Sequence, residues 1–254
     1  MRIQFSKLTF TASIMLALTF IFSCSNDDEN NNGNEPGGGS PSGCGVDYNY
    51  VGGTGCDISG YKFEEIGTQT WMAQNLNCDV AVAVKCYDGK PANCEKYGGL
   101  YDWATAMALP PKCNSVLSTS DPDCAIKIPY HRGICPSGWH IPSDADWNVL
   151  MKKANPSCSD NSDCANAGTK LKATSGWCSN GNGTDDFKFA ALPGGYSNSD
   201  GYFLNVGYYG RWWSASEYTA NYAYRRYMGY DYENVLWSHK YKGVLLSVRC
   251  VKDK

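Results

Sequence analysis

The chain has 254 residues, of which 43% are hydrophobic and 19% charged, and its formal net charge is -3. This length is typical of one or at most two globular domains. The slight acidic balance lacks the basic excess with which nucleic-acid-binding proteins neutralise phosphates, so we expect no nucleic-acid partner. Thirteen cysteines and 18 tyrosines are the unusual features of the composition.

The N-terminal segment, residues 1–23, predicts an export signal. Two basic residues precede an apolar run over residues 8–22, which is shorter than the roughly 20 residues of a membrane-spanning helix. The junction at Cys24 resembles the lipobox of bacterial lipoproteins, which implies a lipid anchor on Cys24; an ordinary signal peptide cut nearby is the alternative. The acidic run at 25–30 resembles tags that direct some lipoproteins to the outer-membrane surface, and would also suit a plain linker. We expect a surface-exposed, lipid-anchored outer-membrane protein.

A flexible tether is predicted over residues 24–45. Asn, Gly, Pro, Ser and acidic residues dominate this segment. Such a composition cannot bury enough apolar surface to offset the entropy of ordering the chain. We therefore place a single folded domain at residues 46–254.

The cysteines of the folded part predict disulfides. Twelve remain after Cys24, and an even number in an exported chain favours disulfides over metal or redox chemistry. The absence of a Cys-x-x-Cys spacing argues against a zinc or thioredoxin-like site. Short loops rich in turn-forming residues separate four pairs, namely Cys44–Cys56, Cys86–Cys94, Cys113–Cys124 and Cys158–Cys164. Spacing leaves open the pairing of Cys78, Cys135, Cys178 and Cys250.

The stretch from Cys135 to Met151 contains a predicted helix start. Ser143 followed by Asp146 is an acidic variant of the capping box, in which each side chain bonds the other residue's backbone amide. The Asn-Pro pair at 155–156 is expected to end this helix. Helical spacing gives it one apolar face, formed by Trp147, Leu150, Met151 and Ala154.

A second amphipathic helix is predicted over residues 97–107. Leu100, Trp103 and Met107 follow helical spacing there, and the proline pair at 110–111 would end the helix. The three apolar side chains are expected in the core.

The remaining pattern predicts strands and loops. Residues 60–77 alternate apolar and polar side chains around Gly67, which indicates a β-hairpin. Residues 112–130 are polar and predict an excursion held by a disulfide. From residue 187 onward, short strand-like runs are separated by Gly, Asn and Asp, among them a terminal strand over 244–252. Two helices and many short antiparallel strands give the class α+β.

Seven blocks of sequence resemble a known family. They occur in one order: Cys86–Trp103, Cys135–Trp147, Gly168–Ala173, Asn182–Phe187, Leu192–Tyr196, Trp212–Glu217 and Ser247–Asp253. Together they resemble the Fibrobacter succinogenes major paralogous domain (FISUMP), over about residues 57–253. The resemblance implies a bacterial, exported and frequently lipid-anchored protein, and the family's biochemical function is largely undefined.

The layout of the blocks is also similar to the C-type-lectin-like and sulfatase-modifying-factor folds. In those folds a cysteine near the second helix is bonded to one in the last strand, which implies Cys135–Cys250 here and leaves Cys78–Cys178. The copper-binding catalytic cysteine pair of formylglycine-generating enzymes has no evident counterpart in this chain. Fold-level analogy of this kind says little about function.

Residues suited to catalysis are sparse. Of the three histidines, His140 lies between Trp139 and Ile141, which favours a packed, hydrogen-bonded ring over a general base. A glycosidase needs two carboxylates that face each other across a cleft. Candidates in the β-rich half are Asp185, Asp186, Glu217, Asp231 and Glu233. We assign no catalytic residue and expect a protein that is not an enzyme.

The loop around Asn180, Asn182 and Asp185 is a weak calcium candidate. Oxygen-bearing side chains alternate with glycines there, but the loop lacks the Asp-rich start and distant Glu of an EF-hand. A turn whose Asp side chains cap backbone groups is the favoured interpretation. We expect no cofactor.

The aromatic residues of the second half predict a binding surface. Eleven of the 18 tyrosines lie between residues 196 and 241. Flat rings with hydrogen-bonding tips suit stacking on sugar rings or contact with a protein. The alternative is that the rings only pack against one another across the strands of the domain. Period-two alternation puts several of them on one face, and the predicted ligand-binding residues are Tyr222, Tyr224, Arg226, Tyr230, Trp237 and Trp212.

These features together predict an extracellular binding or adhesion protein. Its expected partners are the membrane, through the anchor at Cys24, and a glycan or protein outside the cell. An extracellular carbohydrate-active hydrolase and a structural envelope component are the two alternatives.

Overall fold

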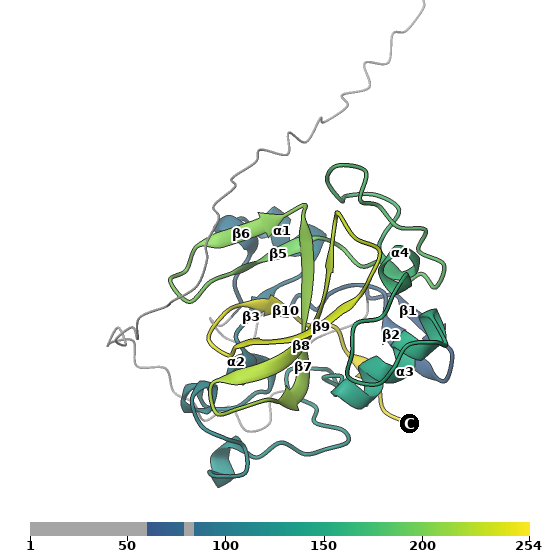
Figure 1. Ribbon diagram of the computed structural model, residues 1–254. Coiled ribbons are helices and arrows are strands. Elements are labelled where there is room, and N and C mark those ends of the chain that lie inside the picture. The colour runs from purple at the N-terminus through teal and green to yellow at the C-terminus, as the bar shows by residue number, and fades with distance from the viewer. Residues whose placement is uncertain (1–59, 79–83) are drawn as a thin grey trace, which may run out of the picture. The chain divides into compact units, whose positions relative to one another are not determined.

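The structure is a computed structural model that describes residues 60–78 and 84–254, all in one compact unit (Figure 1). Its helices are short and most of its strand pairs are antiparallel, so the predicted α+β class is confirmed. The predicted export signal, tether, lipidation site at Cys24 and disulfide Cys44–Cys56 lie outside the described residues. The helices of the described part are α1 (Pro91–Tyr97), α2 (Trp103–Ala106), α3 (Asp144–Ala154) and α4 (Ala167–Leu171), with single 3-10 turns at Tyr87–Gly89, Pro111–Asn114 and Pro122–Cys124.

One sheet joins the start of the described chain to its end. The predicted hairpin is present as β1 (Phe63–Ile66) and β2 (Gln69–Met72), with Gly67 at a positive φ of 67° in the turn. A residue without Cβ adopts this conformation at no steric cost. The sheet order is β1-β2-β11-β4, where β4 is Trp139–His140 and β11 is Val251–Lys252.

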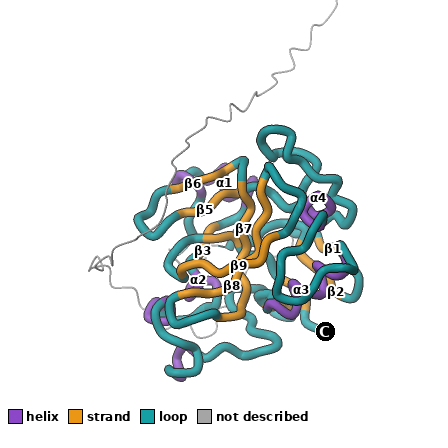
Figure 2. The backbone as a smooth tube through the Cα atoms, viewed as in Figure 1, coloured by secondary structure: helices purple, strands orange, loops and turns teal. Residues whose placement is uncertain are grey.

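The larger sheet has five strands in the order β3-β10-β7-β8-β9 (Figure 1), and Figure 2 shows the strands in orange. Its strands are β3 (Leu100–Tyr101), β7 (Tyr209–Glu217), β8 (Tyr222–Gly229), β9 (Leu236–Tyr241) and β10 (Leu246–Ser247). Only the β10–β7 pair in this sheet is parallel. A separate two-stranded sheet, β5 (Gly194–Ser197) with β6 (Phe203–Val206), packs beside β7 and β10.

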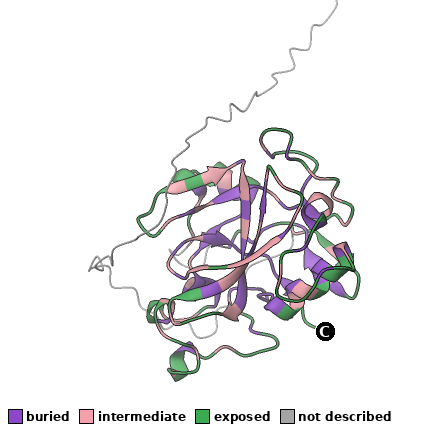
Figure 3. Cartoon of the chain, in the orientation of Figure 1, coloured by how far each residue is buried: buried purple, intermediate pink, exposed green. Residues whose placement is uncertain are grey.

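Strand β7 lies between the two main apolar clusters of the core. Its neighbouring residues Trp212 and Trp213 are both fully buried, one in each cluster. Successive side chains of a strand point to opposite faces, so one strand can supply both clusters. As a consequence, the middle of β7 is buried, while most of the connecting loops are exposed (Figure 3).

Helix α3 begins and ends where the sequence predicts. The Ser143 side chain accepts from the Asp146 amide and the Asp146 carboxylate accepts from the Ser143 amide, which completes the predicted capping box. Asn155 is the C-cap residue. The predicted apolar face is buried, as the core positions of Trp147, Leu150, Met151 and Ala154 show.

The predicted helix over residues 97–107 is wrong. The chain instead ends α1 at Tyr97, passes Gly98 at a φ of 81°, and forms strand β3 before α2 begins at Trp103. Leu100 and Tyr101 pair with β10, which fixes them in an extended conformation. The core assignment holds nonetheless, since the side chains predicted to pack are buried: Leu100, Trp103 and Met107.

The predicted terminal strand is divided between the two sheets. β10 belongs to the larger sheet and β11 to the smaller one, and the chain crosses between them at residues 248–250. Arg249 is fully buried at this crossing. Its guanidinium donates to Asn75 Oδ1 and to the carbonyl oxygen of Phe189. Burial lowers the pKa of Arg249 to about 9.

Four disulfides link described residues, and they match pairings expected above: Cys86–Cys94, Cys113–Cys124, Cys135–Cys250 and Cys158–Cys164. Cys78 and Cys178 are also disulfide-bonded, but the predicted bond between the two is not among the four that link described residues. The surroundings of these two cysteines differ. The Cys78 amide is held by the Tyr101 hydroxyl in one core cluster, whereas the Cys178 amide donates to Gly207 beyond β6.

Candidate functional site

The second half of the chain brings six aromatic rings together on one face of β8 and β9. The pairing register places Tyr222 opposite Tyr241 and Tyr224 opposite His239. Directly opposite residues of an antiparallel pair project from the same face. Tyr218, just after β7, joins them. We call these residues the aromatic row: Tyr218, Tyr222, Tyr224, Trp237, His239 and Tyr241.

Two of the contacts within the aromatic row are close stacks. The Tyr224 and Trp237 ring centroids are 4.8 Å apart at an interplanar angle of 15°, and those of Tyr218 and His239 are 4.2 Å apart at 14°. Edge contacts connect the stacks, since Tyr218 lies 5.3 Å from Tyr224. Tyr222 completes the row at 5.6 Å from His239. The rings form one continuous group.

The aromatic row is at the molecular surface. Tyr218 is 49% exposed and Tyr222 is 40% exposed, and His239 is also exposed. Tyr224 and Trp237 are half-buried, so each presents part of its ring to solvent. Hydrophobic rings that remain open to water are available to a ligand, unlike rings of the core.

Asp144 at the start of α3 holds Trp237 of the aromatic row in place. Its Oδ2 accepts from the Trp237 indole at 2.8 Å, and its Oδ1 lies 3.4 Å from Nη1 of Arg226. Arg226 also donates to Asn148 Oδ1 at 2.9 Å. Burial lowers the pKa of Arg226 to about 10, and the carboxylates of Asp144 and Asp163 oppose this shift. Arg226 is therefore a buried cation that supports Trp237, not a surface contact for a ligand.

Two further predicted site residues do not belong to the aromatic row. Trp212 is fully buried, and its indole donates to Asn75 Oδ1 at 2.7 Å. Strand alternation alone could not reveal this, because both faces of β7 are covered by core clusters. Tyr230 lies past the end of β8, where its ring contacts Tyr208 at 5.0 Å. The structure therefore unites Tyr222, Tyr224 and Trp237 and separates Trp212 and Tyr230 from them.

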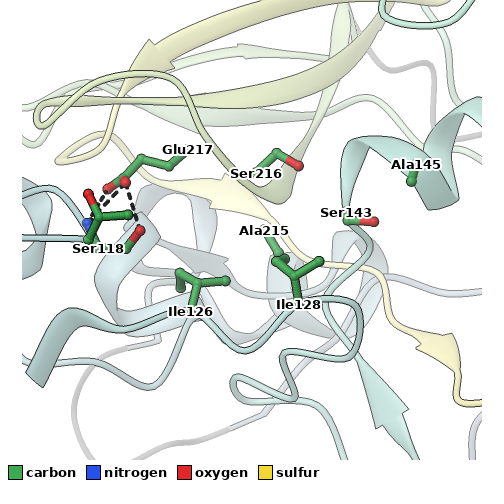
Figure 4. Close-up of a pocket in the computed structure, with 9 residues that line it drawn as sticks. Ser118, Ile126, Ile128, Ser143, Ala145, Ala215, Ser216 and Glu217 are labelled. Atoms are coloured by element: carbon green, nitrogen blue, oxygen red, sulfur yellow. Dashed lines mark hydrogen bonds between the residues drawn. The ribbon is translucent and has the colours of Figure 1, made fainter. Parts of the chain in front are cut away.

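A surface hollow of about 440 Å³ adjoins the aromatic row (Figure 4). The excursion at 112–130 forms one side, and the end of β7 and the start of α3 form the other. Glu217 lines the hollow and is followed directly by Tyr218, while Ser143 lines it and precedes Asp144. The hollow and the row thus share two stretches of chain. Its lining residues are Ser118, Thr119, Ile126, Ile128, Ser143, Ala145, Ala215, Ser216 and Glu217.

Glu217 is engaged in holding the excursion. Its carboxylate accepts from the Ser118 amide at 3.0 Å and from the Ser118 hydroxyl at 2.9 Å. It also pairs with the buried ammonium of Lys242, which donates in addition to the carbonyl oxygens of Cys113 and Ala220. Burial lowers the pKa of Lys242, and Glu217 opposes the shift. The Glu217 carboxylate is therefore fully engaged in contacts that hold the excursion against the end of β7.

A second hollow of about 280 Å³ contains two of the other candidate carboxylates. Asp231 and Glu233 line it together with Asn180 and Asn182. The buried ammonium of Lys172, which also lines this hollow, donates to the carbonyl oxygens of Gly229 and Tyr232 at 3.1 Å.

Two of the three calcium candidates accept hydrogen bonds from backbone amides. Asn182 Oδ1 accepts from the Trp177 amide, and Asp185 Oδ1 accepts from the Ala190 amide at 2.7 Å. Burial raises the pKa of Asp185. Side chains of this loop therefore cap backbone groups, as the favoured interpretation predicts. Across residues 60–78 and 84–254, no group of three or more His, Cys, Asp or Glu side chains could hold a metal ion.

His140 is the packed, hydrogen-bonded histidine that the sequence predicts. Its Nδ1 lies 2.7 Å from Asp253 Oδ1, and its Nε2 lies 3.4 Å from Asp146 Oδ2. The His140 ring is 1% exposed and packs at a tilted angle against the Tyr130 ring. Burial alone would lower the pKa of His140, but the two carboxylates outweigh burial and raise it.

Comparisons with known proteins place the chain in a family. In the part of the chain that the structure describes, no helix combines the length and the apolar character needed to cross a bilayer. Neither curated proteins nor solved structures give a significant match to the chain. The profile of the Fibrobacter succinogenes major domain (Fib_succ_major), in contrast, matches residues 65–252. This range covers the larger sheet, the aromatic row, the adjoining hollow and all but the first residues of β1, and the chain therefore belongs to the Fibrobacter succinogenes major domain family.

Proposed function

We propose that this domain binds glycans outside the cell through the aromatic row. The observation that carries the proposal is the exposed, continuous set of rings on β8 and β9, anchored at Trp237 by Asp144. Sugar rings present C–H groups on their flat faces, and these stack on aromatic rings while hydroxyls bond to polar tips. The Ser216 hydroxyl lines the adjoining hollow and accepts from the Asp144 amide, which leaves its own proton to donate.

The contacts of the candidate carboxylates favour binding without catalysis over hydrolysis. Glu217, which is the carboxylate nearest the row along the chain, is bonded to Ser118 and Lys242. A retaining or inverting glycosidase requires one free carboxylic acid and one free carboxylate across the bound sugar. The hydrolase alternative would have to use Asp231 and Glu233 in the second hollow.

The test is glycan-array binding by the chain without its export signal. We expect Tyr224→Ala or Trp237→Ala to weaken binding about fivefold, because one stacking contact is worth about 1 kcal/mol. Tyr222→Ala should weaken it less, since that ring lies at the edge of the row. Tyr202→Ala is the matched control, because Tyr202 is 68% exposed and lies outside the row. Binding that survives all three row variants would contradict the proposal, and turnover of a chromogenic glycoside would favour the hydrolase.

We further propose that the chain is a lipid-anchored outer-membrane protein with a C-type-lectin-like fold. The lipobox-like junction at Cys24 supports the anchor, and the Cys135–Cys250 bond between the region before α3 and the last strands supports the fold. Incorporation of labelled palmitate into the wild-type chain, and its loss in Cys24→Ala, would test the anchor. Protease digestion of intact cells would test exposure at the surface.

A further inference from the structure

The opposite face of the larger sheet carries two arginines that have no counter-ion among the described residues. Arg225 on β8 precedes Arg226, so its side chain projects away from the aromatic row. The register pairs Arg225 with Trp213, and Arg211 with Tyr227 two residues further along β8. Arg211 and Arg225 are therefore diagonal neighbours on one face. Both residues are half-buried, so part of each remains open to solvent.

Tyrosine rings surround this pair of arginines. The Arg211 guanidinium lies 3.9 Å from the centroid of the Tyr196 ring and 5.0 Å from that of Tyr209. The Arg225 guanidinium lies 4.6 Å from the centroid of the Tyr227 ring. Ring faces attract a guanidinium, but they neither neutralise its charge nor accept its N–H groups in the plane where a carboxylate binds.

Three nitrogen atoms of the two side chains are buried and have no hydrogen-bond partner among the described residues: Nε of Arg211, and Nε and Nη1 of Arg225. Arg211 makes one long bond, 3.5 Å from Nη2 to Asn205 Oδ1. No described acidic residue forms an ion pair with either arginine. Burial, together with the neighbouring positive charge of Arg211, lowers the pKa of Arg225 to about 10.

Three fully buried cations among the described residues have oxygen acceptors close by. Arg226 has Asp144, Lys242 has Glu217, and Arg249 has Asn75 and a backbone carbonyl. A buried charge without acceptors costs free energy, and two such charges side by side add repulsion. An oxyanion from outside the chain would remove both costs.

We propose that Arg211 and Arg225 form a binding site for the carboxylate or sulfate group of an acidic sugar. The fixed fork of each guanidinium suits bidentate contact with an oxyanion, and the surrounding tyrosine rings can pack against the sugar that carries it. The site lies on the face of the sheet away from the aromatic row. It therefore stands or fails independently of glycan binding by the row.

The probe is an oligomer of galacturonic acid, titrated calorimetrically into the chain without its export signal at constant ionic strength. The methyl ester of the same oligomer is the neutral arm, and sodium sulfate is the free-ion arm. We expect the acidic oligomer to bind at least tenfold more tightly than its ester and to raise the thermal midpoint of unfolding. Equal affinity for acid and ester, or binding of the free sulfate ion without any binding of the acidic oligomer, would overturn the proposal.

Variants locate the binding. Arg211→Gln and Arg225→Gln should each weaken binding of the acidic oligomer at least tenfold, and Arg225→Lys should restore part of it because the charge remains without the fork. Lys62→Gln removes one exposed positive charge near β1 and should leave the affinity unchanged. Unchanged affinity in both glutamine variants would refute the site. If these variants fail to fold, the difference in affinity between the acidic oligomer and its ester, measured on the wild-type chain, still tests whether the chain recognises the acidic group.

Discussion

His140 shows how one side chain ties a helix start to the end of the chain. It bridges Asp146, which belongs to the capping box of α3, and Asp253, which follows β11. The protonated ring can donate to both carboxylates at once. Folding raises the pKa of His140, so the ring binds a proton more tightly in the folded state than in the unfolded state.

The sign of this shift gives a pH dependence. The stabilisation is complete below the pKa of an unfolded histidine, about 6.5, and is lost as the pH rises through the raised pKa of the folded state. Asp253→Asn should lower the free energy of unfolding by about 1 kcal/mol at pH 6 and by less at pH 8. Urea denaturation at several pH values measures this. His131 titrates in both proteins and cancels, and a pH-independent difference would contradict the assignment.

At the scale of elements, helix α3 depends on its cap. The Ser143 hydroxyl donates to Asp146 at 2.6 Å and accepts from the Asp146 amide. Ser143→Ala should lower the free energy of unfolding by about 1 kcal/mol, the usual cost of losing an N-cap. Ser157→Ala, at an exposed serine beyond the same helix, is the control for urea denaturation. A cost equal to that of the control would show that the cap does not stabilise the helix.

The two predicted helices explain what the sequence can and cannot predict. The signals of α3 are local, because Ser143, Asp146 and the Asn-Pro pair act within a turn of the helix ends. Helical spacing over 97–107 was misleading because Leu100 and Tyr101 pair with β10, about 145 residues away, and Gly98 adopts a left-handed conformation. Tertiary pairing overrides local pattern at such positions.

The candidate site likewise contains residues whose positions the sequence predicts and residues whose positions it does not predict. Alternation along β8 and β9 correctly brings Tyr222, Tyr224 and Trp237 to one face. It cannot show that α3 covers the far part of that face and buries Arg226, or that core clusters cover both faces of β7 and bury Trp212. The hollow beside the row was not predictable, because the excursion that forms one side of it has no periodic pattern.

Over the whole molecule, the two sheets are joined by the chain that crosses between them at residues 248–250. Cys250 lies at this crossing, and its bond to Cys135 connects the end of the chain to the segment before β4. Both cysteines are fully buried. The bond thus closes a loop that contains α3, α4 and most strands of the larger sheet.

Loop length predicts which disulfide contributes most to stability. Cys135–Cys250 spans 115 residues, whereas Cys158–Cys164 spans 6. Chain-entropy arguments give about 4 to 5 kcal/mol for a loop near 100 residues and less than about 3 for one shorter than 15. The double variant Cys135→Ala/Cys250→Ala should therefore lower the free energy of unfolding by about 2 kcal/mol more than Cys158→Ala/Cys164→Ala. Urea denaturation under non-reducing conditions compares them, and equal losses would mean that native packing, not chain entropy, sets the contribution of this bond.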